Sequence, residues 1–179
     1  QQFELASQDN FISKHGEHAH NWIDYENQPS LHMAHLFSDA GAPWLTQYWV
    51  RRIKKEVFGD ITPFGGYNGD EDQGQMGALG VLMAIGLFDV QGGASTTPQY
   101  EITSPIFDKI TIQLDNRYYP GKEVVIETVN NSPKNVYIQR VSWNGVEHSS
   151  FQLAHEELVK GGHLVIELGD TPNKSWGVN

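Results

Sequence analysis

Three acidic residues, Asp70, Glu71 and Asp72, lie between glycines in the stretch GYNGDEDQGQMGALG, residues 66 to 80. Side chains two positions apart in an extended segment point to the same side, so Asp70 and Asp72 can converge on one water molecule or one cation. The structural alternative is that an Asp caps the following helix and interacts with its dipole, worth about 1 kcal/mol. An EF-hand loop is excluded, because its twelfth position would be Val81 rather than Glu. The spacing leaves the catalytic or metal role and the capping role open.

A second group of polar residues lies in HGEHAHNWIDYENQPSLHMAH, residues 15 to 35, which contains five histidines. Neutral imidazoles bind zinc, and His32 and His35 would share one face of a helix. No HExxH pattern supports a zinc site. The alternative is that the histidines, with Trp22, Tyr25 and Asn27, line a polar pocket or satisfy buried hydrogen bonds. Such a pocket would suit a sugar, which stacks on rings and needs directed hydrogen-bond partners.

Helical periodicity dominates the first 90 residues. Apolar residues recur at helical spacing over 29–40, 42–59 and 72–86, and each of these segments ends at or beside a glycine. Three helices with short connections predict antiparallel neighbours. Residues 1–90 are therefore predicted to form a helical region.

The period changes to two after the Gly/Ser/Thr/Pro-rich stretch QGGASTTPQY. Alternating segments at 109–114, 123–129, 135–143 and 163–168 are separated by turn residues such as Asn144-Gly145. The sequence therefore predicts an α+β chain, in which antiparallel β-sandwich-like strands over 98–179 follow the helices.

The composition restricts the function classes. A net charge of −10 argues against a nucleic-acid partner, and the basic run Arg51, Arg52, Lys54 and Lys55 is expected to form a solvated helix face. No apolar stretch is long enough to span a membrane. The chain begins with neither Met nor an apolar leader, so we expect it to be a piece of a longer protein.

Several segments together resemble the C-terminal part of glycoside hydrolase family 92, the calcium-dependent exo-acting α-mannosidases. They are ENQPSLHMAHLFSDAGAPWLTQ, NGDEDQGQMGALGVLMAIGLFDV, YEITSPIFDKITI, NNSPKNVYIQRVSWNG and TPNKSWG, in the same order as in the family. The resemblance implies that residues 1–90 are the last helices of an (α/α)6-barrel catalytic domain and that 98–179 are the strands that follow it. It also implies a glycan substrate, upstream domains in the same parent chain, and a periplasmic or secreted location.

The resemblance also implies roles for particular residues. Family members invert configuration, and their water-activating aspartates match Asp70 and Asp72. The family pattern GNEPSHH matches residues 26–32, so Asn27 and His32 are expected to contact the sugar and Gln28 to lie at the calcium site. Gln28 replaces a carboxylate with a neutral amide, which removes ligand charge. Leu31 replaces a His, which removes a hydrogen-bonding group.

The general acid of the family is a Glu in a segment resembling EGNAWQY, and these 179 residues contain no such segment. Positioned acid catalysis contributes about 10²–10⁴-fold, so the isolated chain is expected to be inactive or nearly so. Two alternatives are a carbohydrate-binding β-module, with Tyr137 or Trp143 exposed as a platform, and a structural domain. In both, Asp70 and Asp72 would have no catalytic role.

Overall fold

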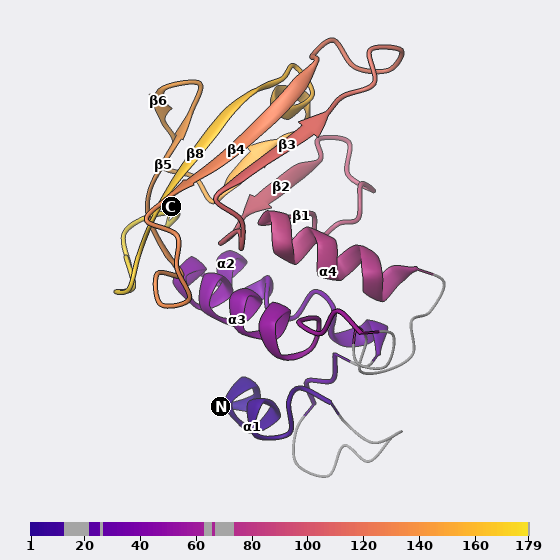
Figure 1. The fold of residues 1–179 in the computed structure, drawn as a ribbon, viewed down its shortest axis with the longest axis vertical. Helices are drawn as coiled ribbons and strands as arrows, with labels where there is room; N and C mark the ends of the chain where they lie inside the picture. Colours follow the sequence, from indigo (N-terminus) through magenta and orange to yellow (C-terminus); the bar gives the residue numbers. More distant parts are fainter. Residues whose placement is uncertain (13–21, 26, 63–65, 67–73, 179) are drawn as a thin grey trace.

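The structure is a computed structural model that describes residues 1–12, 22–25, 27–62, 66 and 74–178. Within these residues the helices come first, apart from one late turn, and the strands follow (Figure 1). The helical elements are α1 (Gln2–Gln8), the 3-10 helix η1 (Gln28–Ser30), α2 (Leu36–Asp39), α3 (Pro43–Glu56), α4 (Gln75–Ile85) and α5 (His155–Leu158). None of the helices in this described part is long and apolar enough to cross a membrane.

The strands form two sheets. They are β1 (Leu87–Phe88), β2 (Gln99–Ile102), β3 (Lys109–Gln113), β4 (Glu123–Val129), β5 (Tyr137–Trp143), β6 (Val146–Glu147), β7 (Gln152–Ala154) and β8 (Gly162–Gly169). The smaller sheet has the order β1-β2-β7 and the larger one the order β3-β4-β8-β5-β6. The predicted fold class, helices followed by a β-sandwich-like region, is confirmed.

One strand pair departs from the all-antiparallel expectation. β4 and β8 pair in parallel, with Ile126 opposite Leu164, whereas the other pairs are antiparallel. Alternating polarity identifies a strand but not the direction of its neighbour. The turn predicted at Asn144-Gly145 is present between β5 and β6, where both residues have the positive φ of a tight hairpin turn.

The segment 29–40 is less helical than its periodicity predicts. Only the 3-10 turn at Gln28–Ser30 and the single turn of α2 are helical, and non-helical turns join them. Side chains bond the backbone here: Ser30 Oγ accepts from Asp24 N at 2.8 Å, and Tyr25 Oη accepts from Ala34 N at 3.2 Å. Such local bonds compete with a continuous helix.

The α4 helix lies between two glycines, Gly74 at its N-cap and Gly86 after its last residue, both with positive φ. A Cβ on Gly86 would lie 2.7 Å from the ring of Pro105, so the chain turns into β1 at a position that only glycine fits. The helix is followed at once by β1, which pairs with β2. The C-terminal end of α4 is thereby fixed against the smaller sheet.

Two buried clusters fill the interior. The first unites the helices and includes Tyr25, Trp49, Ile53 and Met83, and the second lies under the strands. Helix α3 joins the helical region to the larger sheet, because the buried Gln47 Oε1 accepts from Ile138 N of β5 at 2.9 Å. The two regions therefore meet through a specific buried hydrogen bond as well as through apolar contact. The predicted boundary near residue 90 stays a prediction.

Candidate active site

The predicted catalytic pair, Asp70 and Asp72, lies outside the residues that the structure describes. The described chain resumes at Gly74, which is the N-cap of α4. The residue at the N-cap position is therefore a glycine, and neither aspartate occupies it. This corrects the simplest form of the capping alternative, although it does not assign the aspartates a role.

The residues predicted to contact sugar and calcium lie around η1. Asn27 is exposed, Gln28 is half-buried within η1, and His32 is half-buried in the turns that follow. The anchor of this segment is Ser30, which is buried and bonded to Asp24 N. The bond of Ser30 thus ties η1 to the preceding segment, while Asn27 is exposed and Gln28 half-buried.

The described residues do not by themselves supply a calcium site. Gln28 offers one amide oxygen, a suitable but neutral ligand for a hard cation. No group of three or more His, Cys, Asp or Glu side chains within the described ranges is placed to hold a metal ion. Glu26 and the predicted catalytic residues Asp70 and Asp72 lie outside those ranges.

The polar pocket expected from the His-rich segment is not formed by its described members. Tyr25 is fully buried beside Phe11, and burial raises the pKa of its hydroxyl, while Trp22 is 69% exposed. His15, His18 and His20 lie outside the described residues. Trp22 and Tyr25 therefore do not line one sugar-binding wall. Tyr25 instead packs in the helical core.

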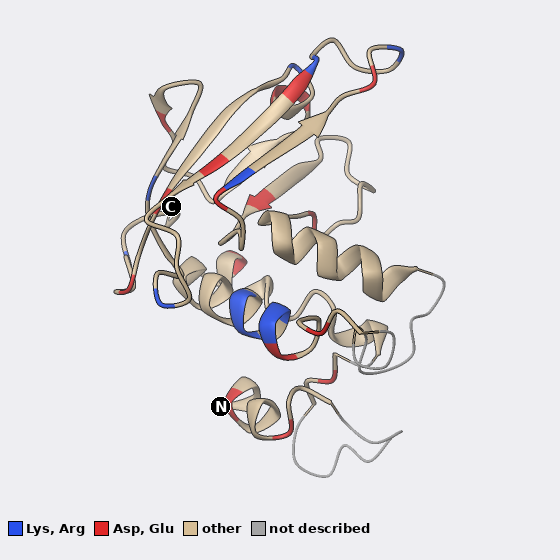
Figure 2. Cartoon of the chain, in the orientation of Figure 1, with Lys and Arg blue, Asp and Glu red and all other residues tan. Residues whose placement is uncertain are grey.

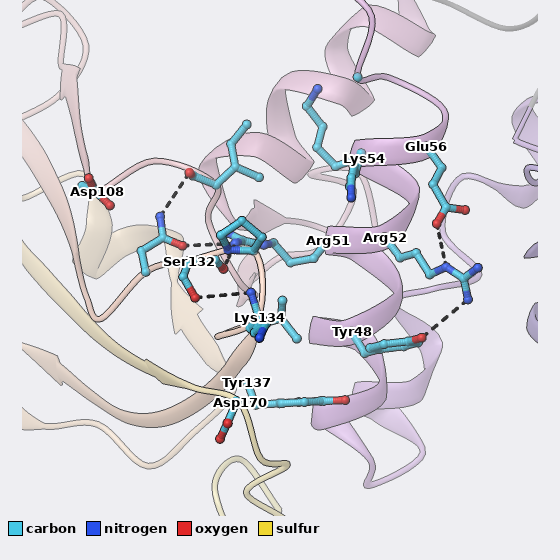
Figure 3. Close-up of a pocket in the computed structure, with 16 residues that line it drawn as sticks. Tyr48, Arg51, Arg52, Lys54, Glu56, Asp108, Ser132, Lys134, Tyr137 and Asp170 are labelled. Atoms are coloured by element: carbon cyan, nitrogen blue, oxygen red, sulfur yellow. Dashed lines mark hydrogen bonds and ion pairs between the residues drawn. The ribbon is translucent and has the colours of Figure 1, made fainter.

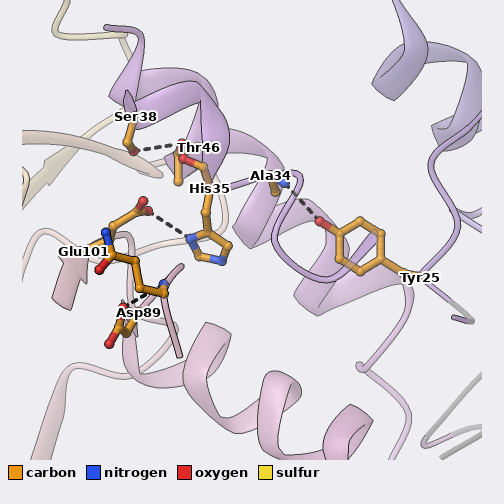
Figure 4. Close-up of polar contacts among 8 residues, drawn as sticks. Tyr25, Ala34, His35, Ser38, Thr46, Asp89 and Glu101 are labelled. Atoms are coloured by element: carbon orange, nitrogen blue, oxygen red, sulfur yellow. Dashed lines mark hydrogen bonds and ion pairs between the residues drawn. The ribbon is translucent and has the colours of Figure 1, made fainter. Parts of the chain in front are cut away.

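His35 makes a contact that its sequence neighbours do not indicate. Its ring stacks on Phe88 at 3.8 Å between centroids, and its Nδ1 lies 3.0 Å from Glu101 Oε2 (Figure 4). Both side chains are almost fully buried. The contact joins the segment before α2 to strand β2, across the junction between the helices and the smaller sheet.

Burial decides the charge of this pair. It lowers the pKa of His35 to about 3, and it raises the pKa of Glu101 to about 8, with further contributions from the charges of Asp39 and Asp89. At neutral pH both groups are therefore uncharged, and a hydrogen bond joins Glu101 Oε2 to Nδ1 of His35. Sequence analysis missed Glu101, because one acid at the end of the QGGASTTPQYE stretch carries no signal of burial.

A cleft of about 1000 Å³ lies between α3 and the loop before β5 (Figure 3). Five of the chain's 12 Lys and Arg residues line it, and Figure 2 shows those of α3 on adjacent turns. They are Arg51, Arg52, Lys54, Lys55 and Lys134. Tyr48 and Tyr137 lie parallel on its wall, with ring centroids 6.3 Å apart. Tyr137 is thus stacked on α3 rather than presented as an open platform, and Trp143 packs against the strand core.

Most of the positive charge in this cleft is used within the fold. Arg51 donates to the backbone oxygens of Pro105 and Ser132 and to Asn131 Oδ1, and Arg52 pairs with Glu56 at 2.7 Å. Burial lowers the pKa of Arg51, although a guanidinium remains charged at neutral pH. The expectation of a wholly solvated basic face is therefore wrong for Arg51, which ties α3 to the strand region.

Comparison with known proteins decides the family. Residues 2–170 match the family described as the glycosyl hydrolase family 92 catalytic domain. The chain belongs to glycoside hydrolase family 92. A protein of Arthroderma benhamiae described as an uncharacterized secreted glycosidase is 33% identical over 162 residues, which cover 89% of this chain and 20% of that protein.

Solved structures agree with this assignment. A family 92 α-mannosidase of Bacteroides thetaiotaomicron, solved with mannoimidazole, superposes with a TM-score of 0.77 at 30% identity over 87% of this chain and 19% of its own. A family 92 inverting mannosidase of the same organism gives a TM-score of 0.74 at 35% identity, over 86% of this chain and 20% of its own. The chain thus spans about a fifth of these relatives, and the recognised resemblance is confirmed as family membership.

Proposed function

We propose that this chain is part of an inverting, exo-acting α-mannosidase that removes mannose from glycans. The observation that supports this most strongly is the family match over residues 2–170, combined with the 30% and 35% identity to two mannosidases of that family. The relative described as secreted supports a secreted or periplasmic location. Because the chain spans about a fifth of these relatives, the activity is proposed for the complete enzyme.

In the proposed reaction, one carboxylate of Asp70 or Asp72 takes a proton from water as the water oxygen attacks the anomeric carbon. The other orients that water, and a general acid outside this chain protonates the departing glycosidic oxygen. Water occupies the space between base and sugar, so inverting enzymes separate their acid and base carboxyls by roughly 6.5–9.5 Å. The segment carrying both aspartates leads directly into α4, whose buried face would anchor it.

Asn27 and His32 are proposed to hydrogen-bond sugar hydroxyls, since the backbone between them is fixed by Ser30 while their own side chains are partly or fully exposed. Calcium is proposed as cofactor, with the Gln28 amide oxygen as one ligand. When bound, such an ion would polarise sugar hydroxyls. The neutral amide predicts weaker calcium binding than a carboxylate at the same position would give.

The test is the activity of the complete enzyme on α-mannosides, followed by NMR of the first-formed anomer, with calcium and with chelator. Release of β-mannose as the first product would support the proposal, and release of α-mannose would contradict inversion. The isolated 179 residues are expected to release no measurable mannose, because they lack the general-acid segment. Mannose release by these residues alone would contradict that part.

A further inference from the structure

A second acid-lined pocket lies at the opposite end of α4 from the predicted catalytic segment. Its volume is about 240 Å³, and among the described residues no Lys or Arg lines it. Three carboxyl groups line it, those of Asp39, Asp89 and Glu101, together with the neutral side chains of Gln99 and Gln152. The eleven residues of α4 extend roughly 16 Å, and Asp89 follows this helix and β1 in the chain.

Three separate segments bring these acids together. Asp39 ends α2, Asp89 follows β1, and Glu101 lies in β2, whose pairing with β1 places it opposite Phe88. Asp89 accepts from the backbone N–H groups of Gln91 and Gly93 at 2.8 Å each, so its carboxylate is held in place. Asp39 is exposed at the rim. The negative charge of the pocket is thus fixed by the fold rather than by one mobile loop.

The second observation is an unsatisfied buried atom. Glu101 is 3% exposed; its Oε2 contacts His35, but its Oε1 has no hydrogen-bond partner within the described structure. A buried polar atom without a partner costs about 1–3 kcal/mol, and Glu101 is one of the residues that line the pocket, so a donor bound there could satisfy this oxygen. The Glu101 carboxyl contacts His35, whose ring in turn stacks on Phe88.

We propose that this pocket binds the guanidinium group of an organic cation. Charge complementarity favours a cation, because three carboxyl groups line the pocket without a basic neighbour. The described acids are not close enough together for any three to share one metal ion. A planar guanidinium spreads five N–H donors over separate directions and so can reach acceptors that one ion cannot. Gln99 and Gln152 would accept the remaining donors.

Binding of this cation is coupled to one proton. The groups that face Glu101 are His35 from before α2, Asp39 from α2 and Asp89 from after β1, and β7 contributes only the neutral Gln152. His32 adds only a repulsive charge behind His35. Without a cation Glu101 is protonated up to a pKa of about 8. A guanidinium favours its ionised form, so the carboxyl proton passes to the buffer and affinity rises with pH up to that value.

The test is calorimetric titration of the purified full-length protein with agmatine, with cadaverine as a diamine of similar length, and with calcium chloride. We expect agmatine to bind most tightly and to release a proton at pH 6.5. The measured heat of binding should therefore depend on the buffer at pH 6.5, and this dependence should disappear well above pH 8. A blocked pentapeptide with one arginine between glycines distinguishes the source: equal or tighter binding indicates a receptor for an arginine side chain, and weaker binding indicates a free ligand.

Matched variants decide whether this pocket is the site. Glu101→Gln can keep the contact with His35, and Asp39→Asn lies at the exposed rim. Each substitution is expected to lower the affinity for agmatine at least fivefold. Glu147→Gln, an exposed carboxylate on β6, should change nothing. Absence of agmatine and peptide binding, or equal binding by the Asp39→Asn protein, would overturn the proposal. Calcium binding that is tighter than agmatine binding and that Glu101→Gln weakens would overturn it as well, in favour of a metal site in this pocket. None of these outcomes depends on mannosidase activity.

Discussion

The two ends of α4 are both associated with acids, but the acids are assembled differently. Before the helix, Asp70 and Asp72 belong to one contiguous motif between glycines. After it, Asp89 meets Asp39 and Glu101 only because β1 pairs with β2 and α2 packs nearby. A contiguous motif can be recognised from sequence, whereas a site built from three segments becomes visible only when the chain is folded.

The largest expected effect concerns the contiguous motif. In the complete enzyme, Asp70→Asn or Asp72→Asn should lower kcat on an α-mannoside by about 10²–10⁴-fold, because the amide cannot take the proton of the attacking water. Steady-state kinetics measures this, with Asp60→Asn as the control from the preceding loop. If both aspartate variants keep near wild-type kcat, the motif is structural and the contrast between the two ends disappears.

What the sequence could predict follows the same division. Strands β4 and β5 were predicted almost to the residue, because period-two alternation and the Asn144-Gly145 turn are local signals. The parallel pairing of β4 with β8 and the stacking of Tyr137 on Tyr48 were not predictable, since they depend on packing between distant segments. Glu101 was missed for the same reason: nothing in its local sequence shows that β2 buries it against His35.

The second prediction tests the docking of α3 on the strand region. Arg51→Ala removes donors to two backbone oxygens and to Asn131, and leaves those acceptors in a partly buried cleft. We expect a loss of about 2–3 kcal/mol in the free energy of unfolding, measured by urea denaturation. Lys55→Ala, on the same helix, should stay within about 0.5 kcal/mol. Equal effects of the two would mean that Arg51 is as solvated as the sequence alone suggested.

The third prediction concerns the acids after α4, through the dependence of stability on pH. The pKa of Glu101 is raised, so its contribution is complete below its unfolded value near 4.5 and is lost as pH rises through about 8. The pKa of His35 is lowered, so its contribution is present above 6.5 and is lost as pH falls toward 3. Between pH 4.5 and 6.5 the two contributions change in opposite directions, so the free energy of unfolding stays constant there.

Above this range, stability should fall by at most about 2 kcal/mol between pH 6.5 and 8, which corresponds to one group over 1.5 pH units. Glu101→Gln should abolish that alkaline fall while keeping the acidic one, because the amide can still hydrogen-bond His35 but cannot ionise. Denaturation at a series of pH values measures both limbs. If the alkaline fall in stability is unchanged in this variant, Glu101 is already ionised in the folded protein. It would then titrate like an exposed carboxylate.

The smallest expected effect concerns Gln28 of η1, the proposed calcium ligand. Gln28→Glu restores a carboxylate where family members carry one, and η1 already holds this position on a fixed backbone. Added ligand charge strengthens calcium binding, so we expect the calcium concentration for half-maximal activity to fall by about tenfold, equivalent to roughly 1.4 kcal/mol. Gln8→Glu at the exposed end of α1 is the matched control for net charge. A response shared by both variants would reflect long-range charge alone, whereas a response confined to Gln28→Glu would place calcium beside η1.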